Sequence, residues 1–229
     1  MSMTAPYQGW VEIDLDALDH NLRVLQGKAG PASIAAVVKA NAYGHGALAI
    51  ARAALRAGAQ RVCTYNLDEA SELRSLGFSG PILVLGSIFP SDAARAVELD
   101  VALTISEPPS ADAVAREALR RHTTTAVHVK VEAGLNRLGL PAADALRFVE
   151  QVRATPGLEL EGFYTHFPSA DGPIPQSDPA DTEIRFDRFL SLARQVNAPI
   201  QHAANTAALL RFPHMALDMV RVGIGLYGL

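Results

Sequence analysis

The sequence predicts an α/β fold with one domain over residues 1–229, a (β/α)8 TIM barrel. Short apolar or β-branched runs recur eight times, roughly twenty to thirty residues apart, and helical patterns separate them. Such alternation indicates parallel strands joined by crossover helices. Eight units of this kind can close into a barrel without exposed edges. The length of 229 residues lies between one and two domains, and barrels of this size often form one unit.

The expected strands are short apolar runs bounded by turn-forming or polar residues, a pattern typical of buried parallel strands. Glycine and asparagine mark the turn after the first run, and similar signals follow the others. In chain order, the expected strands are Ile34–Val38, Arg61–Tyr65, Pro81–Leu85, Val101–Ile105, Thr125–Val131, Leu158–His166, Pro199–Ala203 and Asp218–Val222.

The segments between these strands show helical periodicity, and several begin with a capping or helix-starting residue. An eighth helix precedes the first strand and is expected to fill the remaining gap in the outer ring. The expected helices are Asp16–Lys28, Ala47–Ala57, Asp68–Leu76, Ser91–Leu99, Ser110–Arg121, Pro141–Ala154, Asp181–Val196 and Thr206–Phe212.

Three segments lie outside this scheme. Trp10–Ile13 has the pattern of a small additional strand with no place in the barrel. The chain ends seven residues after Val222, so we expect that part of a larger protein lies beyond Leu229. The loop Pro168–Pro179 contains four prolines, and we expect a mobile excursion over the barrel mouth.

The composition excludes several classes of function. A net charge of -4, from 20 basic and 24 acidic residues, gives no reason to expect a nucleic-acid partner. Cys63 is the only cysteine, so no internal disulfide can form, and Met1–Tyr7 lacks the features of a signal peptide. Charged residues interrupt every apolar run before membrane-spanning length. Neither a metal-ligand spacing nor a nucleophile elbow is present. We expect a soluble cytoplasmic protein without a metal site.

Lys39 occupies the most informative position in the chain. It follows the first expected strand, inside the run AVVKANAYGHG at Ala36–Gly46. Ligands of parallel barrels bind over the carboxyl ends of the strands, so an amine here would face a ligand as a nucleophile. The alternative is a lysine that merely leaves the core for water.

A second group of candidates follows the seventh and eighth expected strands, where such barrels commonly bind phosphate. Asn205 and Thr206 open a short helix after the seventh strand, and Gly223 and Ile224 follow the eighth. Backbone amides and a hydroxyl suit a dianion, and glycine permits close approach. The alternative is that these are ordinary turn residues.

The run AVVKANAYGHG resembles the cofactor-lysine motif of the alanine racemase family, and HAANTAALLRFP and MVRVGIGLYG resemble the family's phosphate loops. The resemblance extends from WVEIDLDALDHNL to VRVGIGLYG. It implies that Lys39 holds pyridoxal 5'-phosphate as a Schiff base. It also implies that the cofactor phosphate is bound by Tyr43, Asn205, Thr206, Gly223 and Ile224. For Tyr43 the alternative is a half-buried aromatic residue that packs on the following helix.

The resemblance assigns two further residues to the cofactor ring. Arg221 is expected to hydrogen-bond the pyridine nitrogen, and a guanidinium does not give up its proton at neutral pH. The pyridine nitrogen therefore stays largely unprotonated, and the cofactor ring withdraws electrons only weakly. This favours simple proton exchange at the α-carbon of the substrate. His166, in the run YTHF, is expected to pack against the ring. For Arg221 the alternative is an ion pair with a carboxylate such as Asp218. For His166 the alternative is a hydrogen-bonded histidine of the core.

Lys130 and Arg137 form a second pair of cations. The resemblance implies that Arg137 contacts the ring hydroxyl of the cofactor, and in several family members the lysine that matches Lys130 is carbamylated. The family usually has aspartate, threonine and glycine where this chain has Glu132, Ala133 and Asn136. These departures weigh against carbamylation of Lys130.

The activity that the resemblance implies is interconversion of L- and D-alanine, which supplies D-alanine for cell-wall peptidoglycan. The Lys39 amine would act as base on one face of the substrate. In the family, the base on the other face is a tyrosine of a carboxyl-terminal β domain, contributed by the partner subunit of a homodimer. Nothing in the 229 residues corresponds to that domain, so we expect a barrel with little or no racemase activity alone.

Two other functions stay open at this point. The chain could be a single-domain carrier of pyridoxal phosphate without turnover, a barrel of about this length whose motifs do not resemble AVVKANAYGHG. It could also bind a phosphorylated metabolite through the phosphate loops alone, with Lys39 incidental.

Overall fold

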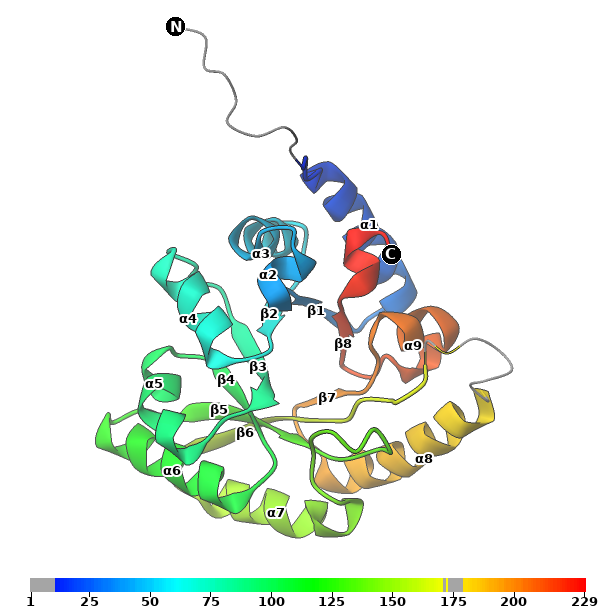
Figure 1. Cartoon of the computed structure of the whole chain (residues 1–229). Coiled ribbons are helices and arrows are strands. Elements are labelled where there is room, and N and C mark those ends of the chain that lie inside the picture. Colours follow the sequence, from blue (N-terminus) through cyan, green and yellow to red (C-terminus); the bar gives the residue numbers. More distant parts are fainter. Residues whose placement is uncertain (1–10, 171, 173–178) are drawn as a thin grey trace, which may run out of the picture.

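A barrel of parallel strands forms the centre of the protein (Figure 1). The computed structural model describes residues 11–170, 172 and 179–229. Within these residues, eight strands are hydrogen-bonded in the order β7-β6-β5-β4-β3-β2-β1-β8. They are β1 (Ser33–Val37), β2 (Arg61–Thr64), β3 (Ile82–Ser87), β4 (Ala102–Ile105), β5 (Thr125–Lys130), β6 (Leu158–Tyr164), β7 (Ile200–His202) and β8 (Met219–Val222).

Hydrogen bonds between β7 and β8 close the barrel. The Asp218 N–H donates to the Gln201 carbonyl at 3.0 Å, and the Gln201 N–H donates to the Asp218 carboxylate at 2.8 Å. Beyond them, the Arg221 N–H donates to the Ala204 carbonyl at 3.0 Å. The predicted (β/α)8 TIM barrel is therefore confirmed.

Helices surround the strands (Figure 1). Every expected helix is present, with ends displaced by no more than two residues. None of the helices in the described part of the chain has the length and apolarity that crossing a bilayer requires. The α-helices are α1 (Leu15–Ala29), α2 (Lys39–Tyr43), α3 (Ala47–Arg56), α4 (Leu67–Ser75), α5 (Ala93–Glu98), α6 (Pro108–Arg120), α7 (Ala142–Ala154), α8 (Pro179–Val196) and α9 (Thr206–Arg211). Short 3-10 turns are η1 (Pro90–Asp92), η2 (Pro213–Met215) and η3 (Ile224–Tyr227).

The first helix illustrates how the sequence builds the outer ring. The Asp14 side chain caps α1 by accepting two first-turn N–H groups at 2.9 and 3.0 Å. Leu18, Leu22 and Leu25 recur at helical spacing and are buried, and Gly30 ends the helix with φ 62°. The helix packs against α3, α9 and η3, and Figure 1 shows it beside the carboxyl end of the chain. It thus fills the gap in the ring, as expected.

Alternate residues of each strand face two different apolar layers. One side packs against the helices and forms the large core. The other side faces the interior of the barrel, where a smaller cluster is formed by Ala35, Val37, Cys63, Leu83 and Met219.

The additional strand expected at Trp10–Ile13 is wrong for residues 11–13, while Trp10 lies outside the described residues. Val11 is 84% exposed, and the chain enters α1 directly after the Asp14 cap. A strand needs a neighbour for its backbone hydrogen bonds, and no strand of the described part of the chain pairs with this segment. In the proline-rich loop, residues 171 and 173–178 lie outside the described residues, so its mobility stays untested.

Candidate active site

The carboxyl ends of the strands surround a cavity of about 230 Å³. A cavity of about 310 Å³ lies at the opposite end of the barrel, and none of the predicted site residues lines it. The cavity at the carboxyl ends is the candidate site because parallel barrels bind their ligands at that end and because the residues assigned from the sequence line it. All nine residues assigned from the sequence lie there: Lys39, Tyr43, Arg137, His166, Asn205, Thr206, Arg221, Gly223 and Ile224.

Lys39 follows β1 and begins α2, which is one turn of left-handed helix. Residues 40–43 have φ between 51° and 54°, a conformation that costs roughly 1–2 kcal/mol for each L-residue. Glu69 of α4 supports the turn by accepting the N–H that follows Lys39 at 2.7 Å. Asn41 accepts the first N–H of α3 at 2.8 Å. The Lys39 Nζ lies 5.8 Å from the centre of the Tyr43 ring, so the strained turn brings amine and phenol together.

A corner of the cavity has the features of an anion site. The Thr206 Oγ1 accepts the Gly223 N–H at 3.0 Å and the Gly225 N–H at 3.4 Å. A Cβ at Gly223 would lie 2.7 Å from the Tyr43 hydroxyl, and one at Gly225 would lie 2.4 Å from the Thr206 Cγ2. Only glycine allows the backbone this close to the two hydroxyl-bearing side chains. Amides and hydroxyls thus meet in one small volume, as a phosphate requires.

The two remaining phosphate-loop residues have simpler surroundings. Asn205 caps α9, because its side-chain oxygen accepts the Ala208 N–H at 2.9 Å. Its interpretation as a helix-opening residue is therefore correct, and it also lines the cavity. Ile224 begins η3 at the rim of the cavity, where its side chain is 47% exposed.

Arg221 is buried at the end of β8 and is held by three acceptors. Its Nη1 donates to the His202 Nδ1 at 2.6 Å. Its Nη2 donates to the Thr165 and Ala203 carbonyls at 2.8 and 3.0 Å. Asp218 instead binds a backbone amide of β7, so the alternative of an Arg221–Asp218 pair is wrong. Burial lowers the pKa of the Arg221 guanidinium, yet the group still has only N–H donors to offer.

Cations dominate the rest of the cavity. Burial and the nearby Arg221 and Lys130 lower the pKa of His166 to about 3, so this ring is neutral. Burial, Arg221 and Arg137 lower the pKa of Lys130 to about 8. Among the described residues that line the cavity there is no carboxylate. An anionic ligand therefore fits this site electrostatically.

The loop after β5 carries Arg137 and keeps its shape despite its unusual sequence. Asn136 has φ 52°, a left-handed conformation that asparagine tolerates almost as glycine does. Glu132 accepts an N–H of the loop at 2.6 Å, and Arg185 of α8 donates to the Ala133 carbonyl at 2.6 Å. The substitution of asparagine for the glycine of the resembling motif is thus compatible with the turn.

Sequence reasoning missed several residues of the cavity. The most important is Tyr164, whose ring lies 4.9 Å from the Arg221 Cζ and 5.7 Å from the Lys130 Nζ. It lies two residues before His166, at the end of β6, and strand alternation from His166 could have identified it. The others carry no chemical signal of their own: Val37, Tyr65, Leu85, Leu138 and Ala207. The prediction that β6 extends to His166 is wrong, since the strand ends at Tyr164.

Comparison with known proteins gives one consistent result. A family model described as "Alanine racemase, N-terminal domain" matches residues 13–229. An alanine racemase of Desulforamulus reducens is 42% identical over 227 residues, covering 96% of this chain and 60% of that protein. An alanine racemase of Methanococcus maripaludis is 37% identical over 227 residues, with the same coverage of 96% and 60%.

Solved structures show the same relationship. An alanine racemase from Streptomyces lavendulae superposes with a TM-score of 0.87 and 33% identity, covering 95% of this chain and 58% of that one. A histidine racemase from Leuconostoc mesenteroides gives a TM-score of 0.84 and 33% identity, covering 100% and 62%. The chain thus spans about 60% of the length of the curated relatives it matches. On the evidence of its sequence motifs, its barrel and these matches, the chain belongs to the alanine racemase N-terminal domain family.

Proposed function

We propose that this chain is the cofactor-binding barrel of a pyridoxal 5'-phosphate-dependent alanine racemase, which interconverts L- and D-alanine. The observation that carries the proposal is the convergence of Lys39 and the anion-binding corner in one electropositive cavity. Because the Thr206 Oγ1 accepts the Gly223 N–H, its own proton can be donated to a phosphate, and the Tyr43 hydroxyl lies close to the same glycine. The residues therefore fit the cofactor.

When bound, pyridoxal 5'-phosphate supplies an aldehyde that joins to amines and a ring that withdraws electrons from the α-carbon. Lys39 would attach the cofactor, and its Nζ would then hold the α-proton on one face of the substrate. Tyr43 and Thr206 would bind the phosphate. Arg221 would donate a hydrogen bond to the ring nitrogen and keep its own proton, which favours proton exchange over other carbanion reactions.

The opposite face of the substrate needs a second proton carrier. Tyr164 lines the cavity, but burial raises its pKa to about 12, and its hydroxyl lies 2.8 Å from the Thr104 Oγ1. It is therefore a poor base at neutral pH. We assign the second carrier to the part of the relatives outside the match, presented across a homodimer. The role of the whole protein would be cytoplasmic supply of D-alanine for peptidoglycan.

Titration with pyridoxal 5'-phosphate tests the cofactor. The wild-type chain should develop a visible absorbance band that Lys39→Ala lacks, and borohydride reduction should attach the cofactor to Lys39. Lys28→Ala is a matched control, because Lys28 lies in the last turn of α1 and outside the cavity. A band of equal size in Lys39→Ala would refute the assignment and favour a barrel for a phosphorylated metabolite.

Proton exchange in heavy water tests the reaction. With cofactor bound, the chain should exchange the α-proton of one alanine enantiomer without net racemisation. No exchange of either enantiomer would favour a cofactor carrier without turnover. Equal deuterium incorporation into both enantiomers would show that a second base is present in this chain. Histidine should be compared with alanine as substrate, because one structural relative is a histidine racemase.

A further inference from the structure

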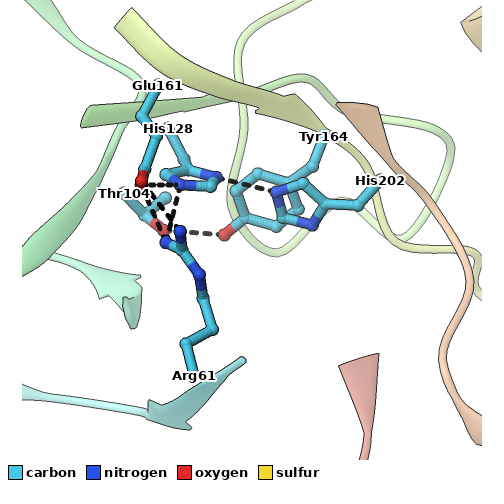
Figure 2. Close-up of polar contacts among 6 residues, drawn as sticks. All are labelled: Arg61, Thr104, His128, Glu161, Tyr164 and His202. Atoms are coloured by element: carbon cyan, nitrogen blue, oxygen red, sulfur yellow. Dashed lines mark hydrogen bonds and ion pairs between the residues drawn. The ribbon is translucent and has the colours of Figure 1, made fainter. Parts of the chain in front are cut away.

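A chain of polar side chains runs through the barrel beneath the candidate active site. Figure 2 shows the part of it from His202 to Arg61. At the mouth, the Arg221 Nη1 lies 2.6 Å from the His202 Nδ1. The His202 Nε2 lies 2.8 Å from the His128 Nδ1. The His128 Nε2 lies 2.7 Å from a Glu161 carboxylate oxygen. Glu161 and Arg61 line the cavity at the opposite end of the barrel, so the chain connects the two ends.

The donor at one end determines the direction of every bond. Arginine has no acceptor, so the His202 Nδ1 must accept from Arg221. A neutral His202 then has its proton on Nε2 and donates to the His128 Nδ1. His128 in turn has its proton on Nε2 and donates to Glu161. Burial lowers the pKa of both histidines, so both rings are neutral and each has one defined tautomer.

Glu161 is a fixed acceptor at the far end. Arg61 donates to both of its oxygens, at 2.7 and 2.8 Å. Burial alone would raise the pKa of Glu161, but the hydrogen bonds from Arg61 and His128 outweigh burial and hold it well below its usual range. The carboxylate therefore stays ionised and accepts only. Since His128 is neutral, its contact with Glu161 is a hydrogen bond and not an ion pair.

Two features of β6 are needed to build this chain. The register against β5 shifts by one residue, because Val127 pairs with Leu160 but His128 pairs with Gly162. Glu161 is the additional residue, and such a bulge redirects a side chain. In addition, a Cβ on Gly162 would lie 2.1 Å from the His128 Nδ1, so only glycine leaves room for the ring.

We propose that Glu161 is a positioning residue for Arg221: by binding Arg61 and accepting the His128 Nε2–H, it preserves the tautomers of His128 and His202 and so the orientation of the guanidinium at the mouth. The hydrogen bond from Arg221 to the pyridine nitrogen of the cofactor rests on the proposed function. The tautomers of the two histidines do not depend on it. The chain orients and does not conduct protons. Moving a proton from Arg221 to Glu161 would neutralise both ends, and arginine is effectively always protonated in proteins.

Arg61 defines what happens when the carboxylate is lost. Its Nη1 lies 3.3 Å from the His128 Nε2, and in the native chain both atoms donate to Glu161. Without the carboxylate, Arg61 can donate to the His128 Nε2 and drive the proton to Nδ1. His202 would then receive that hydrogen bond on Nε2 and present an Nδ1–H to Arg221. Two donors would face each other, and Arg221 would have to turn away.

Nitrogen-15 NMR of the histidine rings, without cofactor, tests this proposal in the full chain. The wild type should show both His128 and His202 protonated on Nε2. Glu161→Leu should shift both toward the Nδ1–H tautomer by about tenfold or more, whereas Glu161→Gln retains an oxygen acceptor and should keep the native tautomers. The double variant Arg61→Leu/Glu161→Leu should also keep them, because it removes the competing donor and leaves no unpaired charge.

Glu159→Leu is the matched control. Glu159 lies two residues earlier on β6 and lines the same cavity as Glu161, but it is not part of the chain of hydrogen bonds. Its substitution should leave both tautomers unchanged. An Nδ1–H tautomer of either histidine in the wild type would overturn the proposal, even if Glu161→Leu does not fold. Unchanged tautomers in folded Glu161→Leu would overturn it as well.

A second measurement links the chain to the mouth. Affinity for pyridoxal 5'-phosphate should fall about tenfold in Glu161→Leu and stay within about twofold in Glu161→Gln and Glu159→Leu. Equal affinity of Glu161→Leu and wild type would refute the link to Arg221. If the wild type itself shows no Lys39-dependent binding, the proposed function fails while the histidine tautomers still decide the positioning chain.

Discussion

Replacing Gly162 by alanine should destabilise the barrel far more than an added methyl group normally does. The new Cβ would lie 2.1 Å from the His128 Nδ1 and 2.4 Å from its Cε1, so the ring must move by more than an ångström. That movement breaks the bonds of His128 to His202 and Glu161, which are 2.8 and 2.7 Å long. Overpacking and the two lost hydrogen bonds together predict a loss of about 2–6 kcal/mol.

Urea denaturation and thermal melting measure this loss, which corresponds to about 2–4 °C in Tm for each kcal/mol in a chain of this size. The control is a double-mutant cycle with His128→Ala, which removes the ring that the methyl group would meet. Gly162→Ala should cost under about 1 kcal/mol in that background. A loss below about 0.5 kcal/mol in the native background, or equal losses in both backgrounds, would contradict the packing argument.

Three further predictions concern the mouth of the barrel. For Lys130, burial and Arg221 lower the pKa from 10.5 to about 8, so the unfolded chain binds more protons between these values. The free energy of unfolding of the wild type, relative to that of Lys130→Met, should therefore rise as pH increases from 8 to 10.5. Urea denaturation at several pH values measures this difference, and a difference that does not change with pH would contradict the prediction. Thr206→Val should lower the free energy of unfolding by about 1–3 kcal/mol, because the buried Gly223 N–H loses its acceptor, and a loss near zero would show that water replaces the hydroxyl. Tyr43→Phe should weaken pyridoxal 5'-phosphate binding about tenfold without changing the melting temperature. Equal affinity of variant and wild type in a spectroscopic titration would show that the Tyr43 hydroxyl does not contribute to binding.

Much of the barrel could be predicted from the sequence because strands and helices carry local signals. Runs such as Ile34–Val38 are apolar and bounded by turns, and α1 has buried leucines at helical spacing after a capping aspartate. Lys39 could be placed at a strand end for the same reason, and the position of Gly223 after β8 followed from its neighbours. Trp10–Ile13 misled the prediction because alternation alone does not supply a neighbouring strand.

The left-handed turn at residues 40–43 had no comparable signal. Only one of its residues, Asn41, is of a type that commonly adopts positive φ. The turn persists because Glu69 of α4 accepts one of its backbone N–H groups and because the Asn41 side chain accepts the first N–H of α3. Its conformation is therefore a property of the assembled barrel. The sequence around Lys39 indicated a turn but not its hand.

The sequence by itself determined the class of fold, the order of its elements and the end of the barrel at which Lys39 and Arg221 lie, because these depend on local periodicity and on the direction of parallel strands. The tertiary structure alone decided that Arg221, His202, His128 and Glu161 form one chain. His128 and His202 are 74 positions apart, and Glu161 reaches His128 only through the bulge in β6. Alternation indicates which side of a strand a residue faces, whereas register, bulges and barrel closure decide which side chains meet.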